Sequence, residues 1–165
     1  MSADDPDPSA GSAEDAAESG TVGAIDGAVL LLAAGKASVA PERLPDLVER
    51  AAAYLRDRAG TYRRTCERVH ADGVREIYFA DGDHWTAVGD DLGFDERETD
   101  AVRRSHEEQL LHVGRRTGRE AEFEHALEIR QPVVVERRGG ADADGGTADD
   151  EKNGNGNADG TGGAA

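Results

Sequence analysis

The strongest hydrophobic periodicity in the chain runs through residues 41–70. Pro41 suits the first turn of a helix, and Asp72-Gly73 marks the end of the helical pattern. Gly60-Thr61 interrupts it, so the pattern predicts either one long helix or two helices joined by a turn at Gly60-Thr61. Apolar side chains recur every three or four positions, as on one face of a helix, at Leu44, Leu47, Val48, Ala51, Tyr54, Leu55, Ala59, Tyr62, Cys66 and Val69.

Helices are also predicted before and after this segment. Residues 22–34 form a short apolar run that indicates a largely buried helix ending at Gly35. Asp95 and Glu98 have the spacing of a capping box, which predicts a helix over 96–116 that ends near Gly118. Its apolar face consists of Thr99, Val102, His106, Leu110 and Val113, and another one or two helical turns are expected in 119–127.

Three segments have the pattern of strands. Residues 74–80 and 83–88 flank Asp81-Gly82, a dipeptide preferred in two-residue hairpin turns, and this register places Tyr78 opposite Trp85. Residues 90–94 are expected to form a loop. The β-branched run at 133–135 follows Pro132, so residues 129–136 suit an edge strand. The fold class expected is α+β, with a small helical core, a β-hairpin and a third edge strand.

The composition divides the chain into one domain and two tails. Residues 1–20 carry six acidic and no basic residues, and residues 139–165 carry six acidic residues and one basic residue. Neither tail contains an aromatic residue, so neither can bury enough apolar area to offset chain entropy. We expect disordered acidic tails at 1–20 and 139–165, and a single α+β domain over 21–138 that carries only part of the net charge of −16.

Charge, hydropathy and cysteine content indicate the environment of the protein. Acidic residues outnumber basic ones, and the only lysines are Lys36 and Lys152, so the composition resembles that of proteins from salt-in halophiles, notably haloarchaea. The longest apolar run, 28–34, is too short to span a bilayer, and no basic residue precedes Lys36 as a secretory signal would require. One cysteine fits a reducing compartment. We expect a cytoplasmic protein without a membrane segment.

One pair of residues invites a metal or nucleophile hypothesis. Cys66 and His70 are four residues apart, so on the expected helix they share a face. A zinc shell would still need distant ligands such as His84, His106 or His112, and a Cys–His nucleophile would need an orienting group that no motif supplies. A buried free cysteine behaves as a small hydrophobe, which is the simpler interpretation.

The remaining candidates have structural explanations. His106 lies on an apolar stripe and is expected in the core or an interface, and the acidic pairs Asp81/Asp83 and Asp90/Asp91 fit a hairpin tip and a solvated loop better than a divalent-cation site. The chain has no P-loop, dinucleotide-binding, nucleophile-elbow or zinc-protease motif. We therefore expect no enzymatic activity, no catalytic residue, no cofactor and no metal site.

A turn at Gly60-Thr61 would give the order helix, helix, turn, helix, hairpin, helix, which resembles a winged helix-turn-helix over residues 21–88. The resemblance implies a recognition helix beginning at Thr61, a wing tip at Asp81-Gly82-Asp83, and DNA contacts from Arg63, Arg64 and Arg68. This is the alternative function: a DNA-binding transcriptional regulator.

A non-enzymatic protein-interaction or regulatory module is the favoured function. The proposed wing tip is acidic and Glu67 lies among the proposed DNA contacts, both of which weaken the DNA-binding hypothesis. The apolar stripe of 96–116, flanked by arginines, suits a homodimer or a protein partner.

Overall fold

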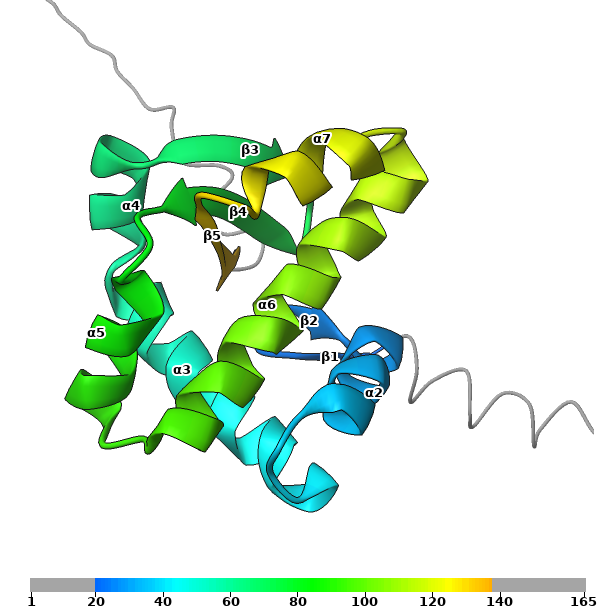
Figure 1. The fold of residues 1–165 in the computed structure, drawn as a ribbon. Coiled ribbons are helices and arrows are strands. Elements are labelled where there is room, and N and C mark those ends of the chain that lie inside the picture. Colours follow the sequence, from blue (N-terminus) through cyan, green and yellow to red (C-terminus); the bar gives the residue numbers. More distant parts are fainter. Residues whose placement is uncertain (1–19, 138–165) are drawn as a thin grey trace, which may run out of the picture.

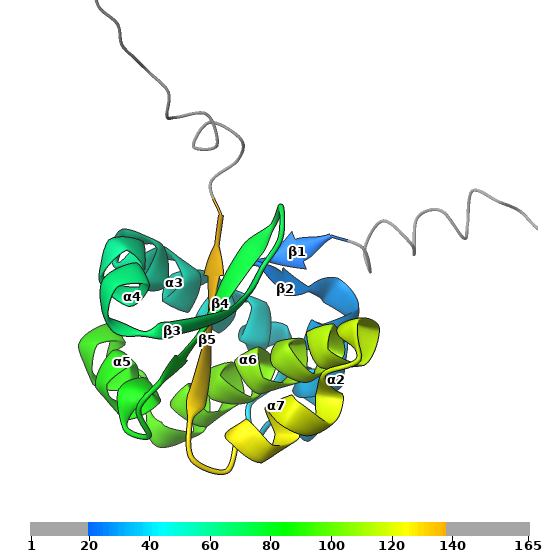
Figure 2. The ribbon, with the colours of Figure 1, turned by 90° about the horizontal axis from the view of Figure 1, so that it is seen from above.

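Strand β4 (Arg75–Ala80) is buried along its whole length. It forms the centre of a three-stranded antiparallel sheet, between β3 (Glu67–Ala71) and β5 (Gln131–Glu136). The structure is a computed structural model that describes residues 20–137. Side chains alternate along β4, so Phe79 packs edge to face on Phe123 of α7 while Tyr78 stacks on Tyr62 of α4. Helices therefore cover both faces of the sheet (Figures 1 and 2).

The expected α+β fold class is confirmed. The predicted tails, apart from Gly20, lie outside the described residues. The elements are β1 (Thr21–Val22), β2 (Ile25–Asp26), α2 (Gly27–Lys36), the 3-10 helix η1 (Pro41–Arg43), α3 (Leu44–Asp57), α4 (Ala59–Thr65), β3 (Glu67–Ala71), β4, α5 (His84–Leu92), α6 (Glu96–Thr117), α7 (Glu120–Ala126) and β5 (Gln131–Glu136).

The hairpin lies one element earlier than the sequence predicts. Strand β3 pairs with β4 across the Asp72-Gly73 turn, and the expected second strand, 83–88, belongs to helix α5. Helix α5 forms because its apolar residues Trp85, Val88 and Gly89 recur at helical spacing and are buried together. The predicted cross-strand pair of Tyr78 with Trp85 and the loop at 90–94 are therefore wrong, since Asp90, Asp91 and Leu92 are helical.

The long periodic segment contains two helices and a strand. Helices α3 and α4 are separated at Arg58, so the predicted turn at Gly60-Thr61 is displaced and Gly60 lies inside α4. Both predicted forms of this segment continue the helix to residue 70, and both are wrong there. From Glu67 the backbone pairs with β4, whose edge would otherwise expose unpaired N–H and C=O groups.

Helix α2, predicted over residues 22–34, begins and ends later than predicted. Val22 and Ile25 pair in a small hairpin whose two turn residues, Gly23 and Ala24, have φ of 56° and 72°. Positive φ at both positions is what a type I′ turn requires. Gly23 is also needed for space, because a Cβ there would lie 2.6 Å from Cβ of Ala52. Helix α2 then runs through Gly35 to Lys36.

The C-terminal predictions agree with the structure. Helix α6 has the capping box of Asp95 and Glu98 and ends before Gly118, and α7 follows within the expected range. Strand β5 is an edge strand that pairs with β4 through Pro132 to Val135. Figure 1 shows α6 crossing the middle of the molecule, where it packs on α2, α3, α5, α7 and β5.

Candidate functional site

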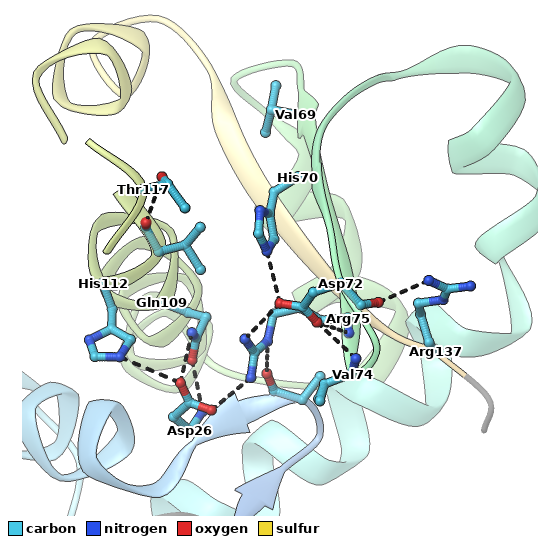
Figure 3. A network of polar contacts seen from close by, with 12 residues as sticks. Asp26, Val69, His70, Asp72, Val74, Arg75, Gln109, His112, Thr117 and Arg137 are labelled. Atoms are coloured by element: carbon cyan, nitrogen blue, oxygen red, sulfur yellow. Dashed lines mark hydrogen bonds and ion pairs between the residues drawn. The ribbon is translucent and has the colours of Figure 1, made fainter. Parts of the chain in front are cut away.

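A buried arginine joins three segments at one end of the sheet. The side chain of Arg75 is 4% exposed, and its terminal nitrogens lie 2.7 Å from Asp26 Oδ1 and 3.4 Å from Asp72 Oδ2. Its Nε donates to the carbonyl oxygen of Ala24 at 2.9 Å. Figure 3 shows the guanidinium between the two carboxylates. The contacts with Ala24 and Asp26 fix β4 against the β1–β2 hairpin.

Asp26 extends the network to helix α6. Its backbone N–H donates to Gln109 Oε1 at 2.7 Å, and Gln109 Nε2 donates back to Asp26 Oδ2 at 3.1 Å. The Gln109 side chain is fully buried, so this reciprocal pair satisfies both of its polar atoms. His112 Nε2 lies 3.7 Å from Asp26 Oδ2, and burial lowers the pKa of His112.

Asp72 organises the β3–β4 turn and orients His70. Its Oδ1 accepts hydrogen bonds from the backbone N–H groups of Val74 and Arg75, at 2.8 and 3.0 Å. Burial raises the pKa of Asp72, but the hydrogen bonds from His70, Val74 and Arg75 outweigh it and lower the pKa to about 2. The ionised carboxylate accepts a hydrogen bond from His70 Nε2 at 2.8 Å, and this bond orients the imidazole ring.

A pocket of about 210 Å³ adjoins this dyad, lined by His70, Asp72, Val113, Arg116 and Thr117. Thr117 Oγ1 donates to the Val113 carbonyl oxygen at 2.8 Å, and His70 Nε2 is bonded to Asp72. The pocket can hold a small polar group, but the oxygens of Asp72 are already occupied.

Two of the three arginines predicted to contact DNA converge on one carboxylate. Arg63 Nε lies 3.3 Å from Glu76 Oε1 and Arg68 NH1 lies 3.6 Å from Glu76 Oε2. Arg64 does not join them and contacts Thr61 Oγ1 at 3.5 Å. The three arginines do not share a helix, because Arg68 lies on β3, so the predicted recognition helix and wing are wrong. Binding of DNA stays a prediction.

Glu76 is the centre of this second cluster. Its side chain is 7% exposed, accepts a 2.5 Å hydrogen bond from the Tyr78 hydroxyl, and lies 3.8 Å from Arg137 Nε. Burial raises the pKa of Glu76, but the Tyr78 hydrogen bond and the charges of Arg63 and Arg68 lower it on balance. Burial and the bond to Glu76 raise the pKa of Tyr78 to about 12.

The expectation that Cys66 and His70 lie on one face of a helix is wrong, because the two residues do not share a helix. Cys66 follows α4, whereas His70 lies on β3 and is bonded to Asp72. Within residues 20–137 no three His, Cys, Asp or Glu side chains are grouped as a metal site would need. Cys66 instead lines a pocket of about 430 Å³ with Tyr62 and His84.

Burial determines the state of two further histidines, His84 and His106. The hydroxyl of Tyr62 lies 2.7 Å from His84 Nε2, and burial lowers the pKa of His84 to about 4. His106 is 1% exposed, lies against Trp85 with ring centroids 4.5 Å apart, and accepts from the Val134 N–H at Nδ1. Burial lowers the pKa of His106 to about 3, so it is a neutral core residue.

The apolar faces of α2 and α6 differ from expectation. The stripe of α6 is buried in its own chain, since Val102, His106 and Leu110 are at most 1% exposed. Helix α2, predicted to be largely buried, leaves Leu31 67% and Leu32 52% exposed. Among the helices of residues 20–137, α2 is therefore the one that leaves large apolar side chains exposed.

Sequence reasoning singled out none of Asp26, Arg75, Glu76, Gln109 and Arg137 as site residues. A signal existed: Arg75 and Glu76 are charged residues at the start of a run that otherwise reads as a buried strand. Charges in such a run are retained only when they are paired. The partner of Arg75 at the other end of its ion pair, Asp26, lies 49 residues away in the sequence, and no local pattern identifies it.

Comparison with known proteins gives one match. No curated protein and no solved structure matches the chain. None of the helices in the described part, 20–137, has the length and apolar composition needed to cross a membrane. A family profile matches residues 23–137, which is well over half of the chain and includes both polar clusters. The protein therefore belongs to the family described as Domain of unknown function (DUF8048).

Proposed function

We propose that the protein is a non-enzymatic protein-interaction module that self-associates through the outer face of helix α2. The observation that carries the proposal is the exposure of Leu31 and Leu32 on a helix without a charged residue from Gly27 to Gly35. A helix that is apolar on all sides is normally covered on all sides. The inner face, with Val29, Leu30 and Ala33, is covered by the chain itself.

The spacing on α2 suits a second copy of the same helix. The exposed residues Ala28, Leu31, Leu32 and Gly35 form one stripe at intervals of three and four. An antiparallel pair with a two-fold axis between Leu31 and Leu32 would place leucine against leucine and Ala28 against Gly35. The small residues at both ends allow close approach, and such isologous contacts are the commonest in homodimers.

The chemistry elsewhere favours binding over catalysis. The carboxylates of the two polar clusters are occupied by arginine, imidazole, hydroxyl or backbone N–H groups, as the contacts of Asp72 and Glu76 illustrate. A carboxylate held in this way is a poor general base. Two arginines beside the α6 stripe, Arg103 and Arg104, are likewise occupied, since both pair with Asp100.

Sedimentation equilibrium of the full chain tests the proposal at low and at high NaCl concentration. A net charge of −16 repels a second copy, so added salt should strengthen an apolar dimer. The double variant Leu31→Gln/Leu32→Gln should be monomeric at concentrations where the parent is dimeric. Ile129→Gln is the matched control, because Ile129 is 76% exposed and lies between α7 and β5.

Two results would overturn self-association through α2. One is a parent protein that remains monomeric at every concentration and salt level. The other is a dimer whose dissociation constant is unchanged in the Leu31/Leu32 variant, or changed equally by Ile129→Gln.

A further inference from the structure

We propose that the arginines around Glu76 bind the phosphate group of a small phosphorylated ligand. Arg63 comes from α4, Arg68 from β3 and Arg137 from the residue after β5, and all three approach the same carboxylate within 3.8 Å. Two consecutive elements, α4 and β3, and the distant residue after β5 thus place guanidinium groups at one point of the surface. We call Arg63, Arg68 and Arg137 the arginine cluster.

The cluster carries more positive charge than Glu76 neutralises. One carboxylate faces three guanidinium groups, which leaves an excess of about two charges. The excess lies at the surface, because the side chains of Arg63, Arg68 and Arg137 are 55%, 53% and 36% exposed. Such an excess in a chain of net charge −16 defines a local site for an anion.

The contacts with Glu76 leave donors for a ligand. Arg63 and Arg137 approach Glu76 through Nε, and Arg68 approaches it through one terminal nitrogen. Arg137 also donates through NH1 to the Asp72 carbonyl oxygen at 2.9 Å. A guanidinium has five N–H groups, so each arginine retains donors that a second acceptor can use.

Glu76 holds the cluster in place before any ligand arrives. The Tyr78 hydroxyl fixes one carboxylate oxygen at 2.5 Å, and β4 carries both residues in the middle of the sheet. Charged side chains that are already positioned lose less entropy on binding. The carboxylate therefore positions the arginines and does not itself contact the ligand.

The size of the cluster decides between a single phosphate and a polyanion. Proteins that bind duplex DNA commonly neutralise about 6–10 phosphates along the backbone. The arginine cluster offers three guanidinium groups, and the rest of a strongly acidic chain would repel the neighbouring phosphates. A phosphate has several oxygens that can accept from different guanidinium groups, whereas a carboxylate offers only two in one plane.

Titration of the full, ¹⁵N-labelled chain with inorganic phosphate tests the proposal, with chloride at matched ionic strength as the reference. The Nε–H signals of Arg63, Arg68 and Arg137 should shift and saturate together. Arg68→Gln should weaken phosphate binding about tenfold, the loss of one charge-assisted contact. Arg104→Gln removes the same charge from a side chain that pairs with Asp100, and it should leave the affinity unchanged.

Thermal melting first shows whether the variants are folded, so that a loss of phosphate binding is not caused by unfolding. If Arg68→Gln does not fold, Arg63→Gln replaces it with the same expectation. Shifts that do not saturate, or an equal loss of affinity in Arg104→Gln, would overturn the proposal. The proposal would also be overturned if duplex DNA bound more tightly than inorganic phosphate, with a salt dependence that corresponds to more than three phosphate contacts. Such a result requires a larger surface than the arginine cluster.

Discussion

Arg75 is a cation in a place where charges are rarely tolerated. Burying a guanidinium costs several kcal/mol unless its donors are matched, and here they are matched by Asp26, Asp72 and the Ala24 carbonyl. The last contact also stabilises an unusual backbone, because Ala24 has a φ of 72° that residues other than glycine adopt at a cost. One side chain therefore holds the hairpin turn, the β3–β4 turn and the sheet together.

We predict that Arg75→Met destabilises the protein by about 3–5 kcal/mol, because it leaves the carboxylate of Asp26 partly buried without its cation. Chemical denaturation of the full chain measures the change in the free energy of unfolding. The matched control is Arg104→Met, whose side chain is 42% exposed and should cost about 0–1 kcal/mol. Equal losses in the free energy of unfolding would show that the buried network stabilises the protein no more than a surface ion pair does.

Helices α6 and α7 approach so closely that only glycine fits between them. A Cβ on Gly114 would lie 2.9 Å from Cα of Glu120 and 3.0 Å from a ring carbon of Phe123. A Cβ on Gly60 in α4 would meet nothing closer than 3.5 Å, the flexible end of Arg64. The two helical glycines thus have the same backbone cost and opposite surroundings.

Gly114→Ala should therefore lower the free energy of unfolding by about 1–3 kcal/mol, since the backbone of α7 must move. Gly60→Ala should raise it by about 0.5–1 kcal/mol, because alanine favours the helix and displaces nothing. Thermal and chemical melts of the two variants measure both changes. Changes of the same sign would contradict the packing described for α6 and α7.

The predicted elements were correct where a local signal was unique. The capping box of Asp95 and Glu98 and the β-branched residues of β5 each had one interpretation, and both are confirmed. The chain contains Asp-Gly twice, at Asp72-Gly73 and Asp81-Gly82, and the prediction assigned the hairpin turn to the second pair. The open edge of β4 selects the first, and that choice depends on tertiary pairing.

The candidate site was much less predictable than the elements. The charges of Arg63 and Arg68 make them candidate binding residues, whereas the apolar pattern of residues 74–80 predicts only a strand and does not point to their common partner, Glu76. The stripe of α6 was assigned to an interface since the sequence does not reveal how much of it the other elements cover. Local periodicity shows which face of a helix is apolar, but how much of that face is buried depends on the elements that pack against it.

The whole molecule should lose stability on mild acidification. Burial lowers the pKa of His84 to about 4 and that of His106 to about 3, below the ordinary value of about 6.5 that applies when unfolded. The unfolded chain therefore binds more protons below pH 6.5. The stability from the neutral imidazoles is complete above that pH and is lost as the pH falls toward the folded values.

His106→Asn isolates the larger part of this effect, because Asn Oδ1 can accept from the Val134 N–H as Nδ1 does. The parent should lose about 1 kcal/mol per pH unit from this histidine below about pH 6.5, and the variant should have a shallower slope. Denaturation curves at several pH values measure the slope. His125→Asn, at a side chain that is 83% exposed, is the control for the replacement of a surface imidazole. A parent curve that is flat down to pH 5 would refute the assignment.

The position of β5 also fixes the order in which the molecule can form. Val133, Val134 and Val135 are almost fully buried, and one edge of β4 stays open until Gln131–Glu136 is present. Asp26 and Gln109, 83 residues apart, close the other end of the core. During synthesis, the earlier segments therefore lack these partners, so we expect the core to become stable only after β5 has been made. Until then the apolar face of the growing chain depends on dilution or on chaperones to stay unaggregated.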